Sequence, residues 1–307
     1  MRWYQHRFHT PSAHQLVFTI IPRLPKFAHP PIALVTALIF FFLLKKERRA
    51  VMSNLRRIRA RRAPRLVWDT YRVFYSFCDF VVSYCYVPKA SHAELVEMLS
   101  VPEHGAAEID RCLAAGNGVI VWTAHLGNWE FASRLLEMHG VRVNVARVVE
   151  KDNPSEAMLR DLMTNERLRI IQLNENPLAS LELLGALRAG EIVAMQGDRA
   201  NGPNFAALPF FGAPAHFPLG PFALSRASGA PVLPGLVVRE SWLRYRVVMG
   251  EAIPPPADPR AALENAVRFL EENVRLYDYQ WLNFYEFWPP DRHHGHGHSE
   301  PAGNRPG

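Results

Sequence analysis

Cysteine is scarce in this chain of 307 residues, which holds only Cys78, Cys85 and Cys112. The number is odd, the spacing is irregular, and no two of them form a C-x-x-C pair. The sequence therefore supplies neither a disulfide framework nor a cysteine zinc site. Free thiols are typical of a reducing compartment, so we expect the protein to face the cytosol.

Motifs of several common enzyme classes are absent as well. The chain has no G-x-S-x-G, the turn that presents the nucleophile of serine hydrolases, and no G-x-x-x-x-G-K-[ST], the loop that holds nucleotide phosphates. Residues 1–25 are basic and aromatic but lack an apolar run followed by a small-residue cleavage site, which argues against a secretory signal peptide. A serine hydrolase, a P-loop nucleotide enzyme and a secreted protein are disfavoured.

Acidic residues are nearly missing from residues 1–65, which hold fourteen Lys and Arg but a single acid, Glu47. The whole chain has a net charge of +6, so residues 66–307 are net negative. A nucleic-acid enzyme normally spreads positive charge along its binding groove. We therefore expect no nucleic acid partner. We expect the basic N-terminal arm to contact a surface of anionic membrane lipid.

That arm contains the first long apolar run, residues 32–44, followed by a dense series of lysines and arginines. As a helix, thirteen residues rise about 20 Å, which is short of the hydrocarbon core of a bilayer. A tilted or shallow insertion, with the basic side in the cytoplasm, is one interpretation. The other is a buried core helix. Clustered cations beside the run favour the membrane, because each gains about 1 kcal/mol near anionic lipid.

Downstream, the pattern predicts an aromatic helix over 66–86, which suits either a membrane interface or a core, and then alternating strands and helices. Strands are predicted at 119–124, 142–149, 170–173, 192–196, 231–238 and 243–249, and helices at 91–99, 106–115, 128–140, 154–168, 178–187 and 258–277. This alternation predicts an α/β fold with a central, mostly parallel mixed sheet flanked by helices. We expect three parts: an arm with its membrane-associated helix (1–65), an α/β domain (66–290) and a disordered His-rich tail (291–307).

The most informative segment is HLGNWE, where His125 and Glu130 follow a predicted buried strand. Across a strand-to-helix turn, the Gly127 hinge can bring the imidazole back toward Glu130 in the first turn of the helix. The carboxylate would hold one ring nitrogen protonated and raise the pKa of the imidazole, so that the other nitrogen acts as a general base. Helix amides near Asn128 could bind an oxyanion or a phosphate. The simple alternative is a capped helix with a surface histidine.

These residues resemble a known family. TAHLGNWE is similar to the H-x4-D/E motif of the glycerolipid acyltransferase superfamily, and specifically to the bacterial lipid A late (lauroyl and myristoyl) acyltransferases. Three further blocks follow in the family's order: ARVVEKDNPS with Arg147, GDRANGPNFAALPFFG with Asp198 and Arg199, and ASGAPVLPG. The resemblance runs from Ala33 to about Trp288 and includes the Arg-rich sequence around Asn54.

The resemblance implies an inner-membrane acyltransferase on the cytoplasmic face that takes its acyl chain from an acyl carrier protein thioester, with coenzyme A as the less favoured donor. His125 would be the general base and Glu130 its orienter, with Asn128, Arg147, Asp198 and Arg199 binding substrate. Arg147 could instead form a surface ion pair, and Asp198 an Asx-turn. Phe210, Phe211 and Phe217 are candidates for an acyl pocket, although aromatic residues more often simply pack in the core.

No cofactor or metal is expected. The four histidines of the tail could bind a transition metal, but we interpret them as part of a low-complexity end. The acceptor is expected to be a lipid or glycolipid such as a lipid A precursor. Two alternatives stay open: an acyltransferase of another lipid or of an aryl polyene-type pathway, and a non-catalytic membrane-surface protein that binds lipid or carrier protein.

Overall fold

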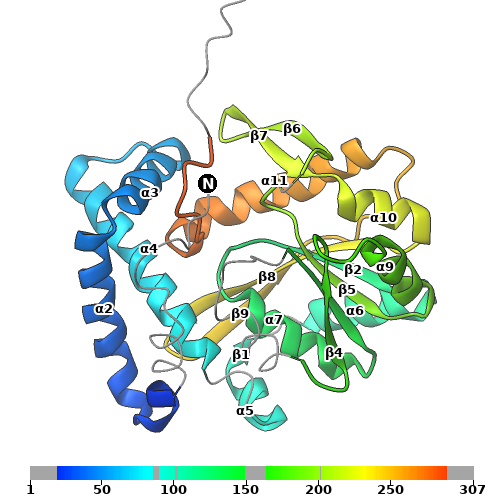
Figure 1. Cartoon of the computed structure of the whole chain (residues 1–307), viewed down its shortest axis with the longest axis horizontal. Coiled ribbons are helices and arrows are strands. Elements are labelled where there is room, and N and C mark those ends of the chain that lie inside the picture. The colour runs from blue at the N-terminus through cyan, green and yellow to red at the C-terminus, as the bar shows by residue number, and fades with distance from the viewer. Residues whose placement is uncertain (1–18, 86–89, 101–102, 149–163, 201, 289–307) are drawn as a thin grey trace, which may run out of the picture.

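The computed structural model describes residues 19–288, apart from 86–89, 101–102, 149–163 and 201 (Figure 1). Its helices are α2 (His29–Leu43), α3 (Lys45–Ile58), α4 (Ala63–Tyr84), α5 (His92–Glu97), α6 (Glu103–Ala114), α7 (Trp129–Leu136), α9 (Ala179–Arg188), α10 (Gly220–Ser228) and α11 (Pro259–Tyr277), with the 3-10 turns η1 (Ile21–Arg23), η2 (Lys26–Ala28), η4 (Glu137–His139) and η5 (Asp278–Gln280). Its strands are β1 (Leu99–Ser100), β2 (Val119–Thr123), β3 (Val143–Arg147), β4 (Leu168–Gln172), β5 (Ile192–Gln196), β6 (Phe205–Phe210), β7 (Ala213–Pro218), β8 (Val232–Ser241) and β9 (Arg244–Met249).

Seven strands form one central sheet in the order β1-β9-β8-β2-β5-β3-β4. Neighbouring strands run parallel, except for the antiparallel pair β8–β9. Strands β2 and β5 lie in the middle of the sheet, and every residue of β2 is buried, as expected for an apolar strand covered by helices on both faces. The predicted α/β class with a mostly parallel mixed sheet is confirmed.

Local sequence signals explain where helices α11 and α5 begin. Helix α11 starts where Asp258 accepts a hydrogen bond from the Arg260 amide and Pro259 occupies the first turn, as predicted from the pattern Asp-Pro. Helix α5 begins with the predicted capping box between Ser91 and Glu94. These elements need no tertiary contact to define their starts.

Helices α2, α3 and α4 stand together along one side of the sheet (Figure 1). Ala33 and Ala37 of α2 are buried, and their small side chains let α2 pack closely on α4. Val51 and Leu55 of α3 belong to the same hydrophobic core as Ile120 and Trp122 of β2. The boundary expected near residue 65 therefore marks a change in charge, while the packed core continues across it.

The predicted elements differ from the structure at residues 154–168 and at the hairpin β6–β7. The helix expected over 154–168 falls mostly outside the described residues, and Leu168 is the first residue of β4 instead. The hairpin β6–β7 was not predicted, because prolines at 209, 214 and 218 disfavour strands. A separate two-stranded sheet has no central strand, so it tolerates them. The expected tail, 291–307, lies outside the described residues.

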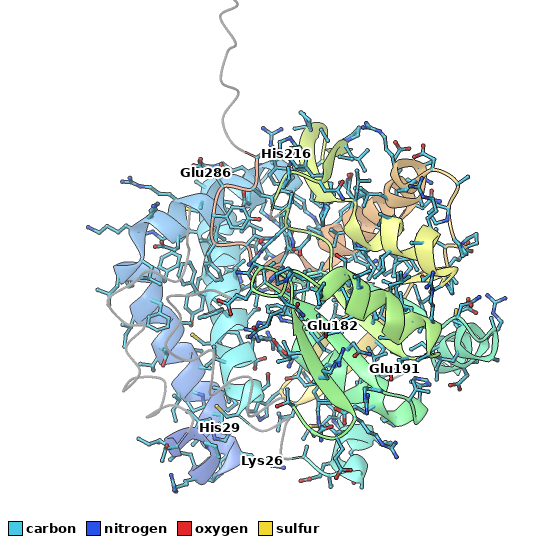
Figure 2. The ribbon with its side chains drawn as sticks, turned by 45° about the vertical axis from the view of Figure 1, so that its right-hand side comes forward. Lys26, His29, Glu182, Glu191, His216 and Glu286 are labelled. Atoms are coloured by element: carbon cyan, nitrogen blue, oxygen red, sulfur yellow. The ribbon has the colours of Figure 1, made fainter. Side chains whose placement is uncertain are left out.

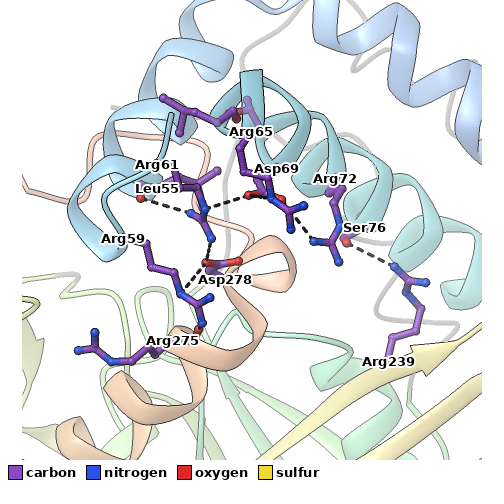
Figure 3. A network of polar contacts seen from close by, with 12 residues as sticks. Leu55, Arg59, Arg61, Arg65, Asp69, Arg72, Ser76, Arg239, Arg275 and Asp278 are labelled. Atoms are coloured by element: carbon purple, nitrogen blue, oxygen red, sulfur yellow. Dashed lines mark hydrogen bonds and ion pairs between the residues drawn. The ribbon is translucent and has the colours of Figure 1, made fainter. Parts of the chain in front are cut away.

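A network of charged side chains around the buried Asp69 carboxylate joins α4 to the residues that precede it and to η5 (Figure 3). The Asp69 carboxylate accepts hydrogen bonds or ion pairs from Arg61 at 2.9 Å, Arg65 at 3.0 Å and Arg72 at 3.3 Å. The guanidinium of Arg61 also pairs with Asp278 in η5. Because both partners of the Arg61–Asp69 pair are nearly inaccessible to solvent, each charge depends on the other for compensation.

Replacing Asp69 with asparagine should therefore destabilise the fold strongly. The Arg61 guanidinium would stay buried with one carboxylate fewer, a defect that costs about 3–5 kcal/mol. Equilibrium urea unfolding measures the change. Glu182→Gln is the control, because Glu182 on α9 (Figure 2) forms an exposed pair with Arg169 that is worth about 0–1 kcal/mol. Equal losses in the two variants would contradict the assignment of Asp69 as a buried hub.

Candidate active site

The site is created by the register of the two central strands. Thr123 of β2 and Gln196 of β5 are paired at the carboxyl ends of these parallel strands. His125 and Asp198 each follow two residues later, so the chain carries both side chains to the same edge of the sheet. The Nδ1 atom of His125 lies 2.7 Å from Oδ1 of Asp198. The carboxyl edge of a parallel sheet is where α/β proteins usually bind ligands.

Two glycines make this close approach possible. Gly127 has a φ of +71°, and a Cβ atom there would lie 2.1 Å from the carbonyl oxygen of Val237. At Gly197 a Cβ atom would lie 1.8 Å from the indole nitrogen of Trp122. Any side chain at either position would push the turn that carries His125 or the turn that carries Asp198 out of place.

A third segment, residues 280–283, completes the site from the C-terminal part of the chain. The amide of Leu282 donates to the carbonyl of His125 at 2.8 Å, and the amide of Gly127 donates to the carbonyl of Gln280 at 3.0 Å. From this segment, Trp281 Nε1 and Asn283 Nδ2 both donate to Oδ2 of Asp198, at 3.2 and 3.3 Å. The fully buried carboxylate of Asp198 is therefore held by three side chains.

The electrostatic environment keeps Asp198 ionised. Burial alone would raise the pKa of its carboxyl, but the charge of His125, the hydrogen bond from the imidazole and the charge of Arg199 together hold that pKa well below its usual range. Since an ionised carboxylate can only accept hydrogen bonds, the hydrogen must be on Nδ1 of His125. The Nε2 atom then carries the lone pair and can accept a proton.

The pKa of His125 is lowered, which corrects the expectation from the sequence. Burial of the imidazole is the main cause, and the charges of Arg199 and Arg147 add to it, while Asp198 acts in the opposite direction. The sequence argument considered only a neighbouring carboxylate, because burial and the two arginines are not visible in the motif. A lowered pKa keeps the ring neutral at pH 7, the form that a general base requires.

Aromatic side chains fix the plane of the imidazole. The ring of Trp129, at the start of α7, meets His125 edge to face at 5.0 Å between centroids. Phe80 of α4 stacks on Trp129 at 4.4 Å between centroids. The histidine is thus supported by the helix that follows it in the chain and by a helix from the N-terminal part.

Asn128, a predicted substrate-binding residue, has structural partners. Its side-chain oxygen caps α7 by accepting from the Phe131 amide at 3.1 Å, and its side-chain nitrogen donates to Ser83 of α4 at 2.8 Å. Its own amide donates to the carbonyl of Val237 at 2.7 Å. These contacts tie the start of α7 to α4 and β8, and a role in substrate binding stays a prediction.

Glu130 and Arg147 lie at the same edge of the sheet. Glu130 is in the first turn of α7 and half-buried, and Arg147 is the last residue of β3. The carboxylate that contacts Nδ1 of His125 in the structure belongs to Asp198, so the orienting role of Glu130 stays a prediction. Arg147 acts on the imidazole through its charge.

The guanidinium of Arg199 is engaged within the protein. Its Nε donates to the side-chain oxygen of Asn283 at 2.8 Å, and its Nη2 donates to the carbonyl of Leu282 at 2.9 Å. Arg199 also lies over the ring of Tyr285. These contacts fix the segment that holds Asp198, and the predicted contact of Arg199 with substrate is not tested by them.

The three predicted acyl-pocket residues, Phe210, Phe211 and Phe217, are buried in an aromatic cluster. Phe210 packs against Phe217, Trp281 and Trp288. The cluster thus supports Trp281, which donates to Asp198. Contact with an acyl chain stays a prediction for all three.

Sequence reasoning missed Trp281 and Asn283. They lie more than 80 residues after Asp198 and belong to no motif. The only available signal was the dense aromatic and polar sequence WLNFYEFW over 281–288. Both side chains reach Asp198 because residues 280–282 pair with residues 125–127, and this pairing is a tertiary contact.

The site pairs a histidine with a buried carboxylate at the strand ends of an α/β sheet. The histidine belongs to an H-x4-E sequence, so the site fits the class of acyltransferases that the motifs indicated. The comparison with known families agrees. The family described as bacterial lipid A biosynthesis acyltransferase matches residues 6–288. The chain belongs to this family, and the prediction from its motifs is confirmed.

Two curated relatives are similar to part of the chain. Both are described as phosphatidylinositol mannoside acyltransferase and come from two strains of Mycobacterium tuberculosis. Each is 30% identical over 152 residues, which is 48% of this chain and 47% of the relative. The chain therefore matches about half the length of these relatives.

Proposed function

We propose that this protein transfers a fatty acyl chain from a thioester donor to a hydroxyl group of a lipid or glycolipid acceptor. The observation that carries the proposal is the contact between the His125 imidazole and the buried Asp198 carboxylate at the carboxyl edge of β2 and β5. Membership of an acyltransferase family supports it. Similarity to phosphatidylinositol mannoside acyltransferases supports a glycolipid acceptor.

In this mechanism His125 acts as the general base. Its Nε2 takes the proton of the acceptor hydroxyl while the hydroxyl oxygen forms a bond to the thioester carbonyl carbon. The tetrahedral intermediate collapses, the carbon–sulfur bond breaks, and the leaving thiolate takes the proton from the imidazolium. The products are an ester and a free thiol, and the base is regenerated without a covalent intermediate on the protein.

Asp198 serves this cycle in two ways. Its hydrogen bond holds the tautomer with the free lone pair on Nε2, and its negative charge stabilises the imidazolium that exists between the two proton transfers. The charge of Arg147, which reaches His125, is suited to an anionic group of the substrate or to the oxyanion of the intermediate.

The donor is proposed to be an acyl carrier protein thioester and the acceptor a lipid A precursor or a related glycolipid. Label transfer tests this. The full-length protein is incubated with radiolabelled acyl thioester, as carrier protein or coenzyme A, and with extracted membrane lipid. We expect label in the lipid fraction. Donor binding without any turnover in a single-turnover experiment would instead support the non-catalytic binder.

We further propose that the protein attaches to the cytoplasmic face of the inner membrane through α2. Residues Lys26–Leu43 are long and apolar enough to cross a membrane by length and composition. One face of α2 packs on α4, however, and the opposite face exposes large apolar side chains: Leu34, Val35, Leu38, Ile39, Phe42 and Leu43. Trp68 of α4 is exposed as well. An apolar face beside exposed cations is suited to shallow insertion into an anionic bilayer surface.

Negative charge introduced on the exposed apolar face of α2 should release the protein from membranes. We expect the double variant Leu38→Glu/Phe42→Glu to move from the membrane pellet to the supernatant after cell lysis and ultracentrifugation, because both carboxylates would have to enter apolar lipid. Deleting residues 1–65 is a poorer test, since it removes Val51 and Leu55 from the core.

The matched control for this experiment is Leu181→Glu on α9. Leu181 is 64% exposed, but α9 lies at the opposite edge of the molecule from α2 (Figure 1). This variant should sediment like the unaltered protein. If the α2 variant also remained in the pellet, the membrane contact would have to lie elsewhere.

A further inference from the structure

Asn54 is a buried polar residue in α3, a helix that contributes none of the site residues described above. Its side-chain nitrogen donates to the carbonyl oxygens of Asn283 and Tyr285, at 3.2 and 2.8 Å. Its side-chain oxygen accepts from the amide of Phe287 at 3.0 Å. All three contacts are made to the backbone of one segment, more than 220 residues away in sequence. Figure 2 shows Glu286, which belongs to this segment, at the same side of the molecule as α3.

This segment needs such a partner. Residues 282–287 are in neither helix nor strand, so their backbone groups have no ladder of hydrogen bonds to join. Buried backbone groups are rarely left unpaired, because a missing partner costs the desolvation of the group. Asn54 satisfies three of them with one side chain.

The same segment contacts the active site on its other side. The side chain of Asn283 donates to Asp198 at 3.3 Å and accepts from Arg199 at 2.8 Å. A continuous series of contacts therefore leads from α3, through the backbone of residues 283–287, to the carboxylate that holds His125.

Without Asn54, apolar contacts would still hold residues 282–287 against α4. The ring of Phe284 packs edge to face on Phe74 and Phe77 of α4. Aromatic packing resists separation but allows small shifts more readily than directional hydrogen bonds do. Loss of Asn54 should thus leave the fold in place and loosen the position of Asn283.

We propose that Asn54 is a positioning residue of the reaction, which fixes Asn283 against Asp198 and Arg199 and thereby sets the geometry of the His125–Asp198 pair. This inference rests on the proposed role of His125 as the general base. It assigns to the N-terminal helices a part in the chemistry in addition to the proposed membrane contact.

The direction of the effect follows from the charges that act on the imidazole, which are Asp198, Arg199 and Arg147. When Asn283 moves away, Asp198 loses a donor and becomes a stronger partner for His125. Arg199 loses an anchor and repels the imidazolium less, and water enters more easily. All three changes raise the pKa of His125 toward its ordinary value near 6.5.

A substrate-free measurement tests this. The full-length protein is labelled with 15N-histidine, the imidazole of His125 is assigned with His125→Gln, and its titration is followed by NMR. The variant Asn54→Leu keeps a similar volume without hydrogen bonds. We expect its His125 midpoint to lie about 0.5–1 pH unit higher than in the unaltered protein, the effect of one lost hydrogen bond. The acyl-transfer rate should fall about tenfold, with rescue in part by Asn54→Gln.

Asn144→Leu is the matched control. Asn144 is equally buried and donates to the Ile192 carbonyl at 3.2 Å, near the beginning of β3. This variant should lose stability and leave the His125 midpoint unchanged. A second variant, Asn283→Ala, breaks the proposed link without altering α3 and should reproduce the shift even if Asn54→Leu fails to fold.

The outcomes are distinguishable. If the His125 midpoint is unchanged in Asn283→Ala, or in a folded Asn54→Leu, the positioning role of Asn54 is overturned. An equal shift in Asn144→Leu would overturn it too, because the effect would then reflect lost stability alone. Retained activity in His125→Ala would instead remove the proposed function on which the inference rests.

Discussion

Replacing His125 with alanine is expected to reduce acyl transfer about 10³-fold, within the range of 10²–10⁴ that a positioned general base contributes. The loss should appear in kcat at saturating donor and acceptor, because the imidazole acts on the hydroxyl proton during the reaction. Only 14% of the His125 side chain is exposed, which makes a substitute base from solvent inefficient. Label transfer to lipid under single-turnover conditions measures the effect.

The pH dependence supplies a second check on His125. Because burial, Arg199 and Arg147 lower the pKa of the imidazole, the base is neutral at pH 7. Activity of the unaltered protein should therefore be constant from pH 7 upward through the neutral range, and it should fall only below about pH 6.5 as the ring gains a proton. A rate that rose through pH 7–8 would contradict the lowered pKa. Residual activity of His125→Ala should lack this acidic limb.

The local part of the site could be predicted from sequence. A buried apolar strand followed by Gly127 and a capped helix is a short-range pattern, so β2, the turn with His125 and the start of α7 were all expected. The family blocks also indicated Arg147 and Asp198 as active-site residues. Each of these inferences uses residues that lie within about one turn or strand of each other.

The pairing of His125 with Asp198 required the order of strands. Asp198 is 73 residues from His125, and the two meet only because β5 lies beside β2 while β3 and β4 lie farther out. Sequence patterns predict that strands exist, but they leave the order of a mixed sheet open. The nearer acid, Glu130, was therefore the natural partner to expect.

Burial is the other quantity that the sequence did not supply. The pKa of His125 was expected to rise because of a carboxylate, and it is lowered because burial and the charges of Arg199 and Arg147 disfavour the imidazolium. Likewise, Asn54 was noticed as part of an Arg-rich family segment, and its contacts with residues 283–287 depend on how α3 packs against the end of the chain.

Which carboxylate orients His125 can be decided by two conservative substitutions. Asp198→Asn should reduce transfer at least about 10²-fold, as loss of the correct tautomer does in other histidine–carboxylate pairs. Glu130→Gln should cause a much smaller loss if Asp198 is the orienter. Both changes remove one negative charge and keep the shape of the side chain, so each is the control for the other. Initial rates of label transfer provide the comparison.

The expected severity of Asp198→Asn follows from the three donors around the carboxylate. The new amide would keep its oxygen toward Trp281 and Asn283, which both donate to Oδ2. Its NH2 group would then face Nδ1 of His125, which must become an acceptor, so the hydrogen moves to Nε2 and the base has no lone pair for the hydroxyl proton. Full activity in Asp198→Asn together with a large loss in Glu130→Gln would transfer the orienting role to Glu130, whereas the reverse pattern assigns it to the carboxylate brought by β5.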